Sequence, residues 1–412
     1  SQKVAIGFDE GAIVLKLGKE SPIVSMDSKS GKFIWVRNNE ILTASVRGAS
    51  KAKASDGEPV RLAAEKDLGT CEVYPQQCKH NSNGRFISVC GDGEYIVYTA
   101  GVLRNKCFGN AIDFAWSTLG TGDFAIRDQD LQIKIFKSFK QTDVSFRPTE
   151  IDAEALDGGA LVAVKAQDAV AFYDWDTGMF IRRIDVPAAP KKVYWNDAGD
   201  QVLVATREAF YILRFDRSAV DAALAGNMDG VDEEDGSIES AFELEAEVNE
   251  VVRSGQWVGD CFLYVNKAGR LNYSVGGQTM TLAHLDKKMY MLGYVARENR
   301  VFLTDKKMQV TSYQLLTSVL EYQTWVLRGN FEEANQILGS GAIPASENNN
   351  IARFLESQGY KEEALEVAND PDLRFSLALQ VRVSRVRFAL FCVSRDIDGC
   401  WLLFCCCCCC VG

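Results

Sequence analysis

The chain has 412 residues, of which 47% are hydrophobic and 25% charged, so it is long enough for two or three globular domains with substantial cores. Its 45 basic and 56 acidic residues give a net charge of −11, which argues against broad binding of nucleic acid or of an anionic membrane. No window reaches the roughly 20 apolar residues of a membrane-spanning helix, and no signal or transit peptide opens the sequence, so we expect a soluble protein.

Two predicted β-hairpins open the chain. VAIGFDEGAIVLKL (4–17) and SPIVSMDSKSGKFIWV (21–36) each place strand-forming runs on both sides of a turn that contains glycine. Together they do not make one complete unit of the repeat that follows. We therefore expect 1–29 to be the remnant of the last blade of a first β-domain, and a second β-domain to occupy 30–314.

One pattern recurs through the second β-domain, in which a polar turn, an apolar run, a glycine-rich turn and a second apolar run follow one another. HNSNGRFISVCGDGEYIVYTA (80–100) is an example. A period near 40 residues with several short strands is typical of propeller blades, so the sequence predicts a degenerate WD-type β-propeller. Only FYDWDTG (172–178) contains a pair that resembles the Trp-Asp pair of WD-type repeats. The marker residues, which are separated by steps of 38, 37, 41, 60 and 39 residues, are Phe86, Phe124, Leu161, Val202, Phe262 and Val301.

The 60-residue step contains an acidic insertion. Residues 218–252 hold no Lys or Arg, and MDGVDEEDGSIESAFELEAEVNE (228–250) is dense in acid. We interpret the insertion as a solvated loop between two blades, with a short helix at SAVDAALAG (218–226), because acidic loops usually only solubilise. A dedicated site for a basic partner is the less favoured alternative.

After the propeller the apolar period changes from that of strands to that of helices. LLTSVLEYQTWVLRGNFEEANQIL (315–338) and NIARFLESQGYKEEALEVANDPDLRFSLALQ (350–380) are apolar at helical spacing and are interrupted at Gly329 and Gly359. Two acids and an alanine follow each interruption, as expected where one helix ends at glycine and the next begins. The pattern predicts helix-turn-helix units of an α-solenoid over 315–380.

The sequence offers no candidate catalytic, cofactor-binding or metal-binding residue. The two histidines, His80 and His284, are far apart, and neither has a second histidine or a nucleophile at a useful spacing. Cys71 and Cys78 lie near His80 at a spacing that fits no common zinc site, and buried hydrophobic thiols are the favoured interpretation. DWDTG (174–178) lacks the further ligands of a calcium loop, so we predict a blade turn there.

Long ungapped strings of this sequence resemble the coatomer beta-prime subunit family, in which a propeller leads into an α-solenoid. The resemblance runs from about Val4 to Gln380 and is far more specific than a blade pattern. The strings are NGRFISVCGDGEYIVYTA, NAIDFAWS, VAFYDWDTGMFIRRI, GQWVGDCFLYVNKAGRLNYSVGG, LAHLDKKMYMLGYV and LLTSVLEYQTWVLRGNFEEANQIL.

This resemblance implies a non-catalytic structural subunit of the coatomer (COPI) coat on vesicles moving among Golgi cisternae and back to the endoplasmic reticulum. It implies that 4–27 ends a first propeller, that 30–314 forms a second, and that 315–380 begins a solenoid. The expected partners are other coatomer subunits, especially alpha. Association with Golgi and vesicle membranes would be peripheral, from the cytoplasmic side. No nucleic acid, cofactor or small-molecule substrate is expected. The family binds dilysine cargo tails on its first propeller, so no cargo-binding residue carries over to this chain.

A ring and a stack of helices present surface area rather than a reactive pocket. Tyr322 and Trp325 on the first solenoid helix are candidate anchors for a partner, with core packing as the favoured role. A ciliary-transport or pore scaffold of the same architecture is an alternative that the strings disfavour. An enzyme built on a propeller would need a pocket of convergent polar groups, for which the sequence supplies no candidate.

The chain ends in VRVSRVRFALFCVSRDIDGCWLLFCCCCCCVG (381–412), with six consecutive cysteines at 405–410. Helical-hairpin spacing and family resemblance both stop at Gln380. We therefore interpret 381–412 as non-homologous, disordered sequence, such as intron read-through or a shifted frame. Adjacent cysteines point in different directions and do not converge on a metal as spaced ligands do. Palmitoylation beside WLLF, which would anchor the chain to a membrane, is the alternative.

Overall fold

The computed structural model describes residues 3–16, 21–47, 55–62, 65–226, 230–232 and 236–381. The chain divides into two compact units, 1–317 and 318–412, and each is described by itself. Within the described ranges, no helix is long and apolar enough to cross a membrane.

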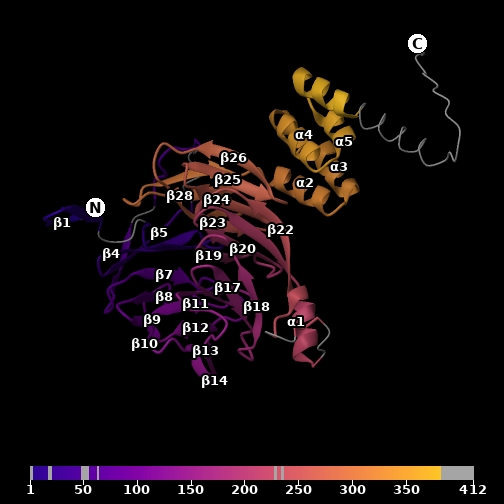
Figure 1. The fold of residues 1–412 in the computed structure, drawn as a ribbon. Helices are drawn as coiled ribbons and strands as arrows, with labels where there is room; N and C mark the ends of the chain where they lie inside the picture. Colours follow the sequence, from indigo (N-terminus) through magenta and orange to yellow (C-terminus); the bar gives the residue numbers. More distant parts are fainter. Residues whose placement is uncertain are drawn as a thin grey trace, which may run out of the picture. The chain divides into compact units, whose positions relative to one another are not determined.

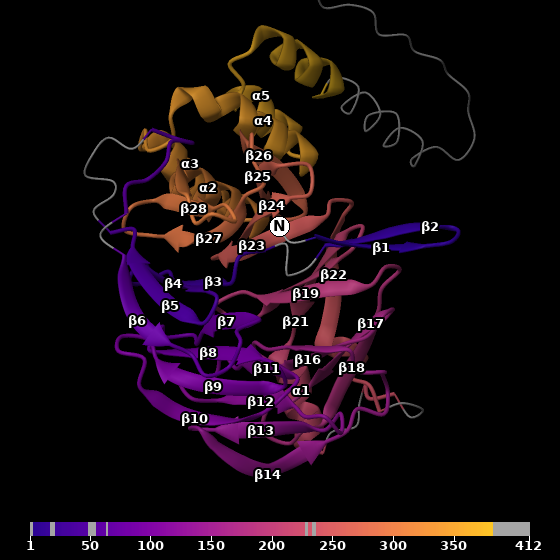
Figure 2. The same ribbon diagram turned by 90° about the vertical axis from the view of Figure 1, so that its left-hand side faces the viewer.

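Within the described residues, unit 1 contains a two-stranded N-terminal sheet and then seven larger antiparallel sheets, which follow one another in chain order. Each strand pairs with its sequence neighbours. Figures 1 and 2 show these sheets as successive blades of a ring. The predicted β-propeller is confirmed, and it has seven blades. Blade 1 is β3 (Val24–Asp27), β4 (Lys32–Arg37), β5 (Glu40–Ser45) and β6 (Lys66–Thr70). Blade 2 is β7 (Gln77–His80), β8 (Phe86–Gly91), β9 (Glu94–Thr99) and β10 (Asn105–Asn110). Blade 3 is β11 (Asp113–Trp116), β12 (Phe124–Arg127), β13 (Ile133–Lys137) and β14 (Lys140–Phe146).

The later blades repeat this plan, except that blade 7 has three named strands. Blade 4 is β15 (Ala155–Asp157), β16 (Val162–Lys165), β17 (Ala169–Tyr173) and β18 (Phe180–Asp185), and blade 5 is β19 (Pro190–Trp195), β20 (Gln201–Thr206), β21 (Phe210–Phe215) and β22 (Phe242–Val248). Blade 6 is β23 (Val252–Val258), β24 (Cys261–Asn266), β25 (Arg270–Val275) and β26 (Gln278–His284), and blade 7 is β27 (Tyr290–Val295), β28 (Arg300–Thr304) and β29 (Val310–Gln314).

Residues 3–16 form a hairpin of β1 (Lys3–Phe8) and β2 (Gly11–Lys16), as predicted. The expected boundary between residues 29 and 30 differs from the structure, because β3 pairs with β4 and belongs to blade 1. The β3 sequence VSMD is half polar, so its pattern does not distinguish the last strand of one domain from the first strand of the next.

The hydrophobic core lies between neighbouring blades rather than in one central layer. Leu161 and Phe172 of blade 4 pack with Val202 and Val204 of blade 5, and all four are fully buried. Equivalent clusters join blades 1 and 2, 2 and 3, 3 and 4, and 5 and 6. A further cluster joins blade 7 to blade 1 and completes the ring. A single blade buries its two faces only by contact with its neighbours, which explains why the second strands are mainly apolar and almost entirely buried.

Close packing at Gly159 leads to a testable prediction. A Cβ built on Gly159 would lie 1.9 Å from Cδ1 of Trp195 in the next blade, whereas a Cβ on Gly101 would meet nothing within 4 Å. We expect Gly159→Ala to lower the free energy of unfolding by about 1 to 2 kcal/mol, since the half-buried Trp195 ring must shift. Urea denaturation of the two alanine variants measures this, and equal stability of Gly159→Ala and Gly101→Ala would contradict it.

A segment between β5 and β6, residues 55–60, crosses from blade 1 to blade 7. The Gly57 amide donates to the Ser312 carbonyl at 3.1 Å, and the Val60 amide donates to the Val310 carbonyl at 2.8 Å. We call residues 55–60 the closing segment, because it lies along β29 as the missing edge of blade 7.

Side chains reinforce the closing segment. Arg300 of β28 donates from Nη2 to Asp56 Oδ1 at 2.6 Å, and the Gln314 amide donates to the same oxygen at 3.0 Å. Arg300 also donates from Nε to Ser312 Oγ at 2.9 Å. The Arg300 side chain is 9% exposed and that of Asp56 51% exposed, so the pair joins a buried cation to a surface carboxylate.

The acidic insertion lies within blade 5 and not between blades, which corrects our expectation. It connects β21 to β22, and it contains helix α1 (Arg217–Leu224) and a short 3₁₀ turn, Glu239–Ala241. The predicted short helix is confirmed. Residues 242–248, which we included in the insertion, form the outer strand of the blade.

Polar side chains link the innermost strands around the ring centre, by which we mean the axis side of β3, β7, β11, β15, β19, β23 and β27. Ser25 of β3 accepts from the backbone amide of His80 at 2.9 Å. Gln256 of β23 donates from Nε2 to Ser28 Oγ at 3.0 Å. These bonds join blades 1, 2 and 6 at positions where backbone pairing between blades is absent from the described sheets.

A buried carboxylate lies at the ring centre. Asp157 of β15 accepts from Lys165 Nζ at 2.6 Å, from Lys79 Nζ at 3.4 Å and from the Val193 amide at 3.2 Å. Lys79 comes from blade 2 and Val193 from blade 5, so one side chain connects three blades. Burial alone would raise the pKa of Asp157, but Lys165 and then Lys79 outweigh it and lower the pKa to about 2.

Unit 2 is helical, as predicted. It comprises α2 (Thr317–Leu327), α3 (Phe331–Gly339), a 3₁₀ turn at Ala345–Glu347, α4 (Asn348–Ser357) and α5 (Lys361–Val367), and a further helical stretch covers 371–381. Gly329 and Gly359 follow α2 and α4 with φ of 77° and 90°, a left-handed conformation that ends a helix. Ala334 and Ala364 are fully buried, and their small side chains allow the helices to pack closely.

Candidate functional site

The two histidines differ in their surroundings. His80 Nδ1 lies 2.8 Å from Ser25 Oγ, and burial lowers the pKa of His80 to about 4, although Asp27 acts in the opposite direction. The imidazole is therefore neutral at pH 7 and held by a hydroxyl. His284 is an exposed residue at the end of β26, in blade 6 rather than blade 2. The structure does not bring the two together.

The propeller cysteines are packed as hydrophobic residues. Cys71 and Cys78 belong to the core between blades 1 and 2, and Cys71 Sγ lies 3.5 Å from the Tyr98 hydroxyl. Burial, and then the neighbouring Cys71, raise the pKa of the Cys78 thiol to about 12, so it stays protonated and is a poor metal ligand. Within the described ranges, no group of three His, Cys, Asp or Glu side chains could hold a metal ion.

DWDTG forms a hydrogen-bonded turn between β17 and β18. Asp174 Oδ2 accepts from the backbone amides of Asp176 and Thr177 at 2.9 and 3.0 Å, and Gly178 has a φ of 70°. Trp175 is buried and donates from Nε1 to the Gly159 carbonyl at 3.0 Å. The carboxylate is used to hold the turn, in agreement with the predicted blade turn.

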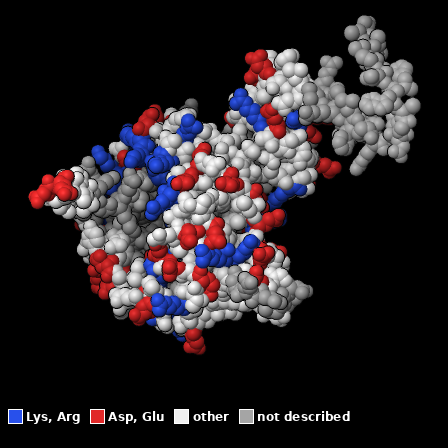
Figure 3. Space-filling model, viewed as in Figure 1, with Lys and Arg blue, Asp and Glu red and all other residues white. Residues whose placement is uncertain are grey.

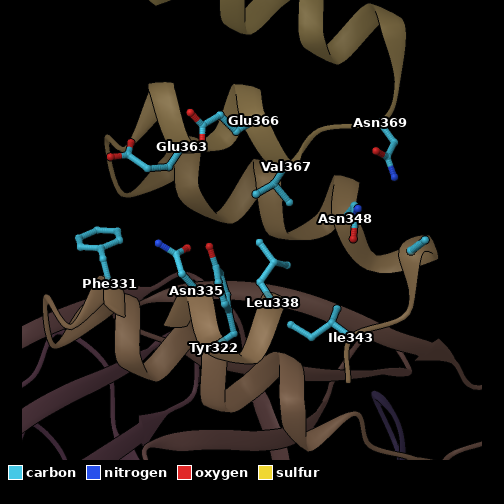
Figure 4. Close-up of a pocket in the computed structure, with 11 residues that line it drawn as sticks. Tyr322, Phe331, Asn335, Leu338, Ile343, Asn348, Glu363, Glu366, Val367 and Asn369 are labelled. Carbon is cyan, nitrogen blue, oxygen red and sulfur yellow. The ribbon is translucent and has the colours of Figure 1, made fainter. Parts of the chain in front are cut away.

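A groove of about 450 Å³ in unit 2 is the candidate functional site, and it lies between α3 and α5 (Figure 4). Tyr322 of α2 and Leu338 of α3 rise toward it from one side, and Glu363 and Val367 of α5 face it from the other. Sequence reasoning did not find this groove, because it is made by residues from two helix pairs. Its lining residues are Tyr322, Phe331, Asn335, Leu338, Ile343, Ala345, Asn348, Glu363, Glu366, Val367 and Asn369.

The helix repeat explains the shape of the groove. Phe331 at the start of α3 and Tyr360 just before α5 occupy corresponding places in the two helical repeats of unit 2. Their rings pack edge-on, with the ring centroids 4.7 Å apart. This contact joins the start of α3 to the residue just before α5 at the groove's Phe331 side. Because Tyr322 is 2% exposed, its ring belongs mainly to the helical core, which is the role that the sequence favoured. Trp325 is half-buried and lies outside the lining residues.

The groove carries polar groups above an apolar floor. The carboxylates of Glu363 and Glu366 make no ion pair within the described part of the chain, and the side-chain amide of Asn335 has no partner there either. Glu363 acts on Tyr322, whose pKa is raised to about 12 by burial first and by this carboxylate second. The groove can therefore offer acceptors to a partner segment while it buries an aliphatic side chain.

On the face of the propeller shown in Figure 3, acidic and basic side chains are interspersed rather than separated into large fields. Such a surface does not attract one polyanion over its whole area, in agreement with the net charge of −11. It suits specific contacts with other folded proteins, where small patches of each sign determine the orientation.

Comparison with known proteins decides the family. Residues 38–305 match the family model described as "COPA/B second beta-propeller", and 322–396 match "COPA/B TPR domain". "Coatomer subunit beta'-1" of Arabidopsis thaliana is 50% identical over 381 residues, which cover 92% of this chain. The chain belongs to the coatomer beta-prime family. "Coatomer subunit beta'" of Homo sapiens is 47% identical over 390 residues, or 95% of the chain. The resemblance predicted from the sequence is confirmed.

The chain spans about two fifths of the length of these coatomer relatives, 40% of the Arabidopsis protein and 42% of the human one. Among solved structures, the "Myceliophteria_thermophila Cps50 (Swd1) beta-propeller domain" matches with a TM-score of 0.52 at 10% identity, covering 73% of this chain and 98% of that one. At that identity the likeness supports the propeller fold alone.

The match to the coatomer helical model runs to residue 396, past Gln380, where we expected the family sequence to end. The expectation of a non-homologous tail over 381–412 therefore does not hold for its first part. Residues 382–412, with the cysteine run at 405–410, lie outside the described residues.

Proposed function

We propose that this chain acts as a structural, non-catalytic part of the coatomer (COPI) vesicle coat, in transport between the Golgi and the endoplasmic reticulum and within the Golgi. The observation that carries the proposal is the identity of 47 to 50% to coatomer beta-prime subunits over more than nine tenths of the chain. Scaffold families of propellers and helical repeats are non-catalytic in general, and His80 and the Cys78 thiol are held in structural roles.

The proposed partners are other coatomer subunits, with alpha bound by the helical unit. The groove between α3 and α5 supports this assignment, because it combines unpaired carboxylates with an apolar floor. Membrane association would then be peripheral, through the assembled coat at cytoplasmic Golgi and vesicle surfaces. The test is co-purification of the tagged chain with the coatomer alpha subunit, and recovery of no coat subunit would overturn the proposal.

The N-terminal hairpin supports a proposal on domain order, namely that β1 and β2 belong to the end of a first propeller that precedes blade 1. Ile6 of β1 is 49% exposed and Val14 of β2 is 62% exposed, although both are apolar. An isolated two-stranded hairpin is at best marginally stable in water, so these strands need further sheet partners. A preceding propeller blade would cover them.

A groove-filling substitution tests the proposed role of the helical unit. Asn335 lines the groove, whereas its exposed neighbour Gln336 does not. We expect Asn335→Trp to reduce recovery of the alpha subunit by about ten-fold, a loss of about 1.4 kcal/mol in binding, because the indole occupies space that the partner needs. The matched control is Gln336→Trp, which adds the same side chain one position along α3. Quantitative immunoblotting after co-purification measures both, and equal recovery from the two variants would exclude the groove.

A further inference from the structure

Cations from three successive blades gather at one end of the propeller ring. Lys165 ends β16, Arg207 follows the last residue of β20, and Lys267 follows the last residue of β24. These are the second strands of blades 4, 5 and 6, so their carboxyl ends lie on the same face of the ring. Lys191 and Lys192 lie near the start of β19, which is antiparallel to β20 and begins on that face.

Hydrogen bonds join two pairs of these residues, and the charges of Lys267 and Arg207 both act on Lys191. Lys165 Nζ donates to the Lys191 carbonyl at 2.9 Å, and Arg253 of β23 donates from Nη2 to the Lys267 carbonyl at 3.1 Å. Lys192 Nζ lies 4.5 Å from the centre of the Tyr194 ring. We use the name basic cluster for Lys165, Lys191, Lys192, Arg207, Arg253 and Lys267.

The positive charge at the ring centre exceeds the negative charge. Asp157 is the carboxylate that acts on Lys192, and it is already bonded to Lys165 and Lys79. One carboxylate therefore faces three ammonium groups from blades 2, 4 and 5. Burial lowers the pKa of Lys192, and repulsion from Lys165 adds to this effect against the attraction of Asp157.

Positive charge also exceeds negative charge around Lys191, Arg207 and Lys267, three exposed members of the basic cluster. Burial lowers the pKa of Lys191, and the charges that add to this effect are the cations Lys267 and Arg207. Within the described residues, Lys191, Arg207 and Lys267 have no ion-pair partner, and the Arg253 Nη1 atom is buried without a hydrogen-bond acceptor. Like charges that lie close together repel one another even at exposed positions, and a guanidinium nitrogen without an acceptor is costly to bury.

A bound oxyanion would remove both costs. A phosphate group carries more than one negative charge and several acceptor oxygens, so it can neutralise several cations and accept from Arg253 at once. A single carboxylate, in contrast, can compensate only one of the excess charges. We propose that the basic cluster of blades 4 to 6 binds a multivalent phosphate group, supplied by a free phosphate compound or by a lipid headgroup. This site is separate from the groove of unit 2 and does not depend on it.

The test uses the full chain and pyrophosphate as the probe, measured by isothermal titration calorimetry at low and at physiological salt. The variant is Lys191→Gln with Arg207→Gln and Lys267→Gln, all exposed positions whose replacement leaves the buried Lys165–Asp157 pair intact. The matched control removes three exposed lysines elsewhere, by Lys140→Gln, Lys287→Gln and Lys307→Gln. We expect the cluster variant to bind at least about ten-fold more weakly than wild type, since each charged hydrogen bond contributes about 1.5 to 3 kcal/mol. We expect the control to bind as wild type does.

A second arm distinguishes the two sources of phosphate. Flotation with phosphatidylcholine vesicles, with and without phosphatidic acid, measures headgroup binding by the same two variants. Cluster-dependent flotation without pyrophosphate binding would assign the site to a headgroup, and the reverse result would assign it to a free compound. Equal weakening in the control variant, tighter binding of hexaglutamate than of pyrophosphate, or binding to neither probe would overturn the proposal.

Discussion

Replacing Asp157 by alanine is expected to lower the free energy of unfolding of the propeller by about 3 to 5 kcal/mol, because it leaves Lys165 charged and buried without its partner. The Lys165 side chain is only 9% exposed and that of Asp157 only 7%, so water cannot take the place of the carboxylate. The variant also removes the acceptor of the Val193 amide and the link to Lys79. Urea denaturation followed by tryptophan fluorescence measures the change. Asp143→Ala, at an exposed position of β14, is the control.

The effect of Asp157 depends on pH in a defined direction. The pKa of this carboxyl is about 2 in the folded protein against an ordinary value of 3.8. Its contribution to stability is therefore full above about pH 4 and is lost as the pH falls toward 2. His80 titrates in both proteins, so the difference between wild type and Asp157→Ala isolates this one group. A stability gap that stays constant from pH 7 to pH 3 would contradict the assigned role.

The junction between blade 7 and blade 1, which the closing segment holds, is called the ring seam. Opening this seam is expected to have the second largest effect on the free energy of unfolding. Arg300→Met keeps much of the side-chain volume but removes the hydrogen bonds to Asp56 and Ser312. We expect a loss of about 2 to 3 kcal/mol, less than for Asp157, because the remaining Asp56 carboxylate is half exposed and regains water. Arg297→Met at an exposed position is the control.

The seam variant has a local signature that a general loss of stability would not give. Hydrogen exchange should rise first at the amides of Gly57 and Val60, which bond to β29, before it rises in blades 3 to 5. Uniform acceleration across all blades would show that Arg300 stabilises the propeller without holding the closing segment.

The blades were predictable because their second strands are mainly apolar and are buried over nearly their whole length. Five of the six marker residues are fully buried, and only Phe86 is partly exposed. That local signal comes from burial on both faces of the strand, so it can be recognised in the sequence without knowing which blades lie on either side. The first strand of blade 1 lacks such a signal, since β3 has the sequence VSMD and every one of its residues is half-buried. The domain boundary was therefore placed too late.

The contacts that close and centre the ring could not be predicted. Arg300 and Asp56 are 244 positions apart, and Lys79 and Asp157 are 78 apart, so no local pattern relates them. The basic cluster likewise depends on three strand ends meeting on one face. The solenoid groove depends on α3 and α5, each of which was predicted as a helix, but their separation follows from tertiary packing at Phe331 and Tyr360. Sequence periodicity identifies such elements and does not identify what they enclose.

The closing segment also determines how the ring would respond to mechanical load. Among the described residues, the backbone hydrogen bonds across the seam come from 55–60, inside a loop of blade 1, whereas Ile23, which leads into β3, bonds to Val36 of β4. Tension applied through the chain before Val24 would act first on the pairing of β3 with β4, and the seam bonds would stay unloaded. Force on that end would peel one inner strand while blades 7 and 1 remain fastened. In a ring with this arrangement, a domain attached covalently before Val24 would not apply force directly to the hydrogen bonds between the closing segment and β29.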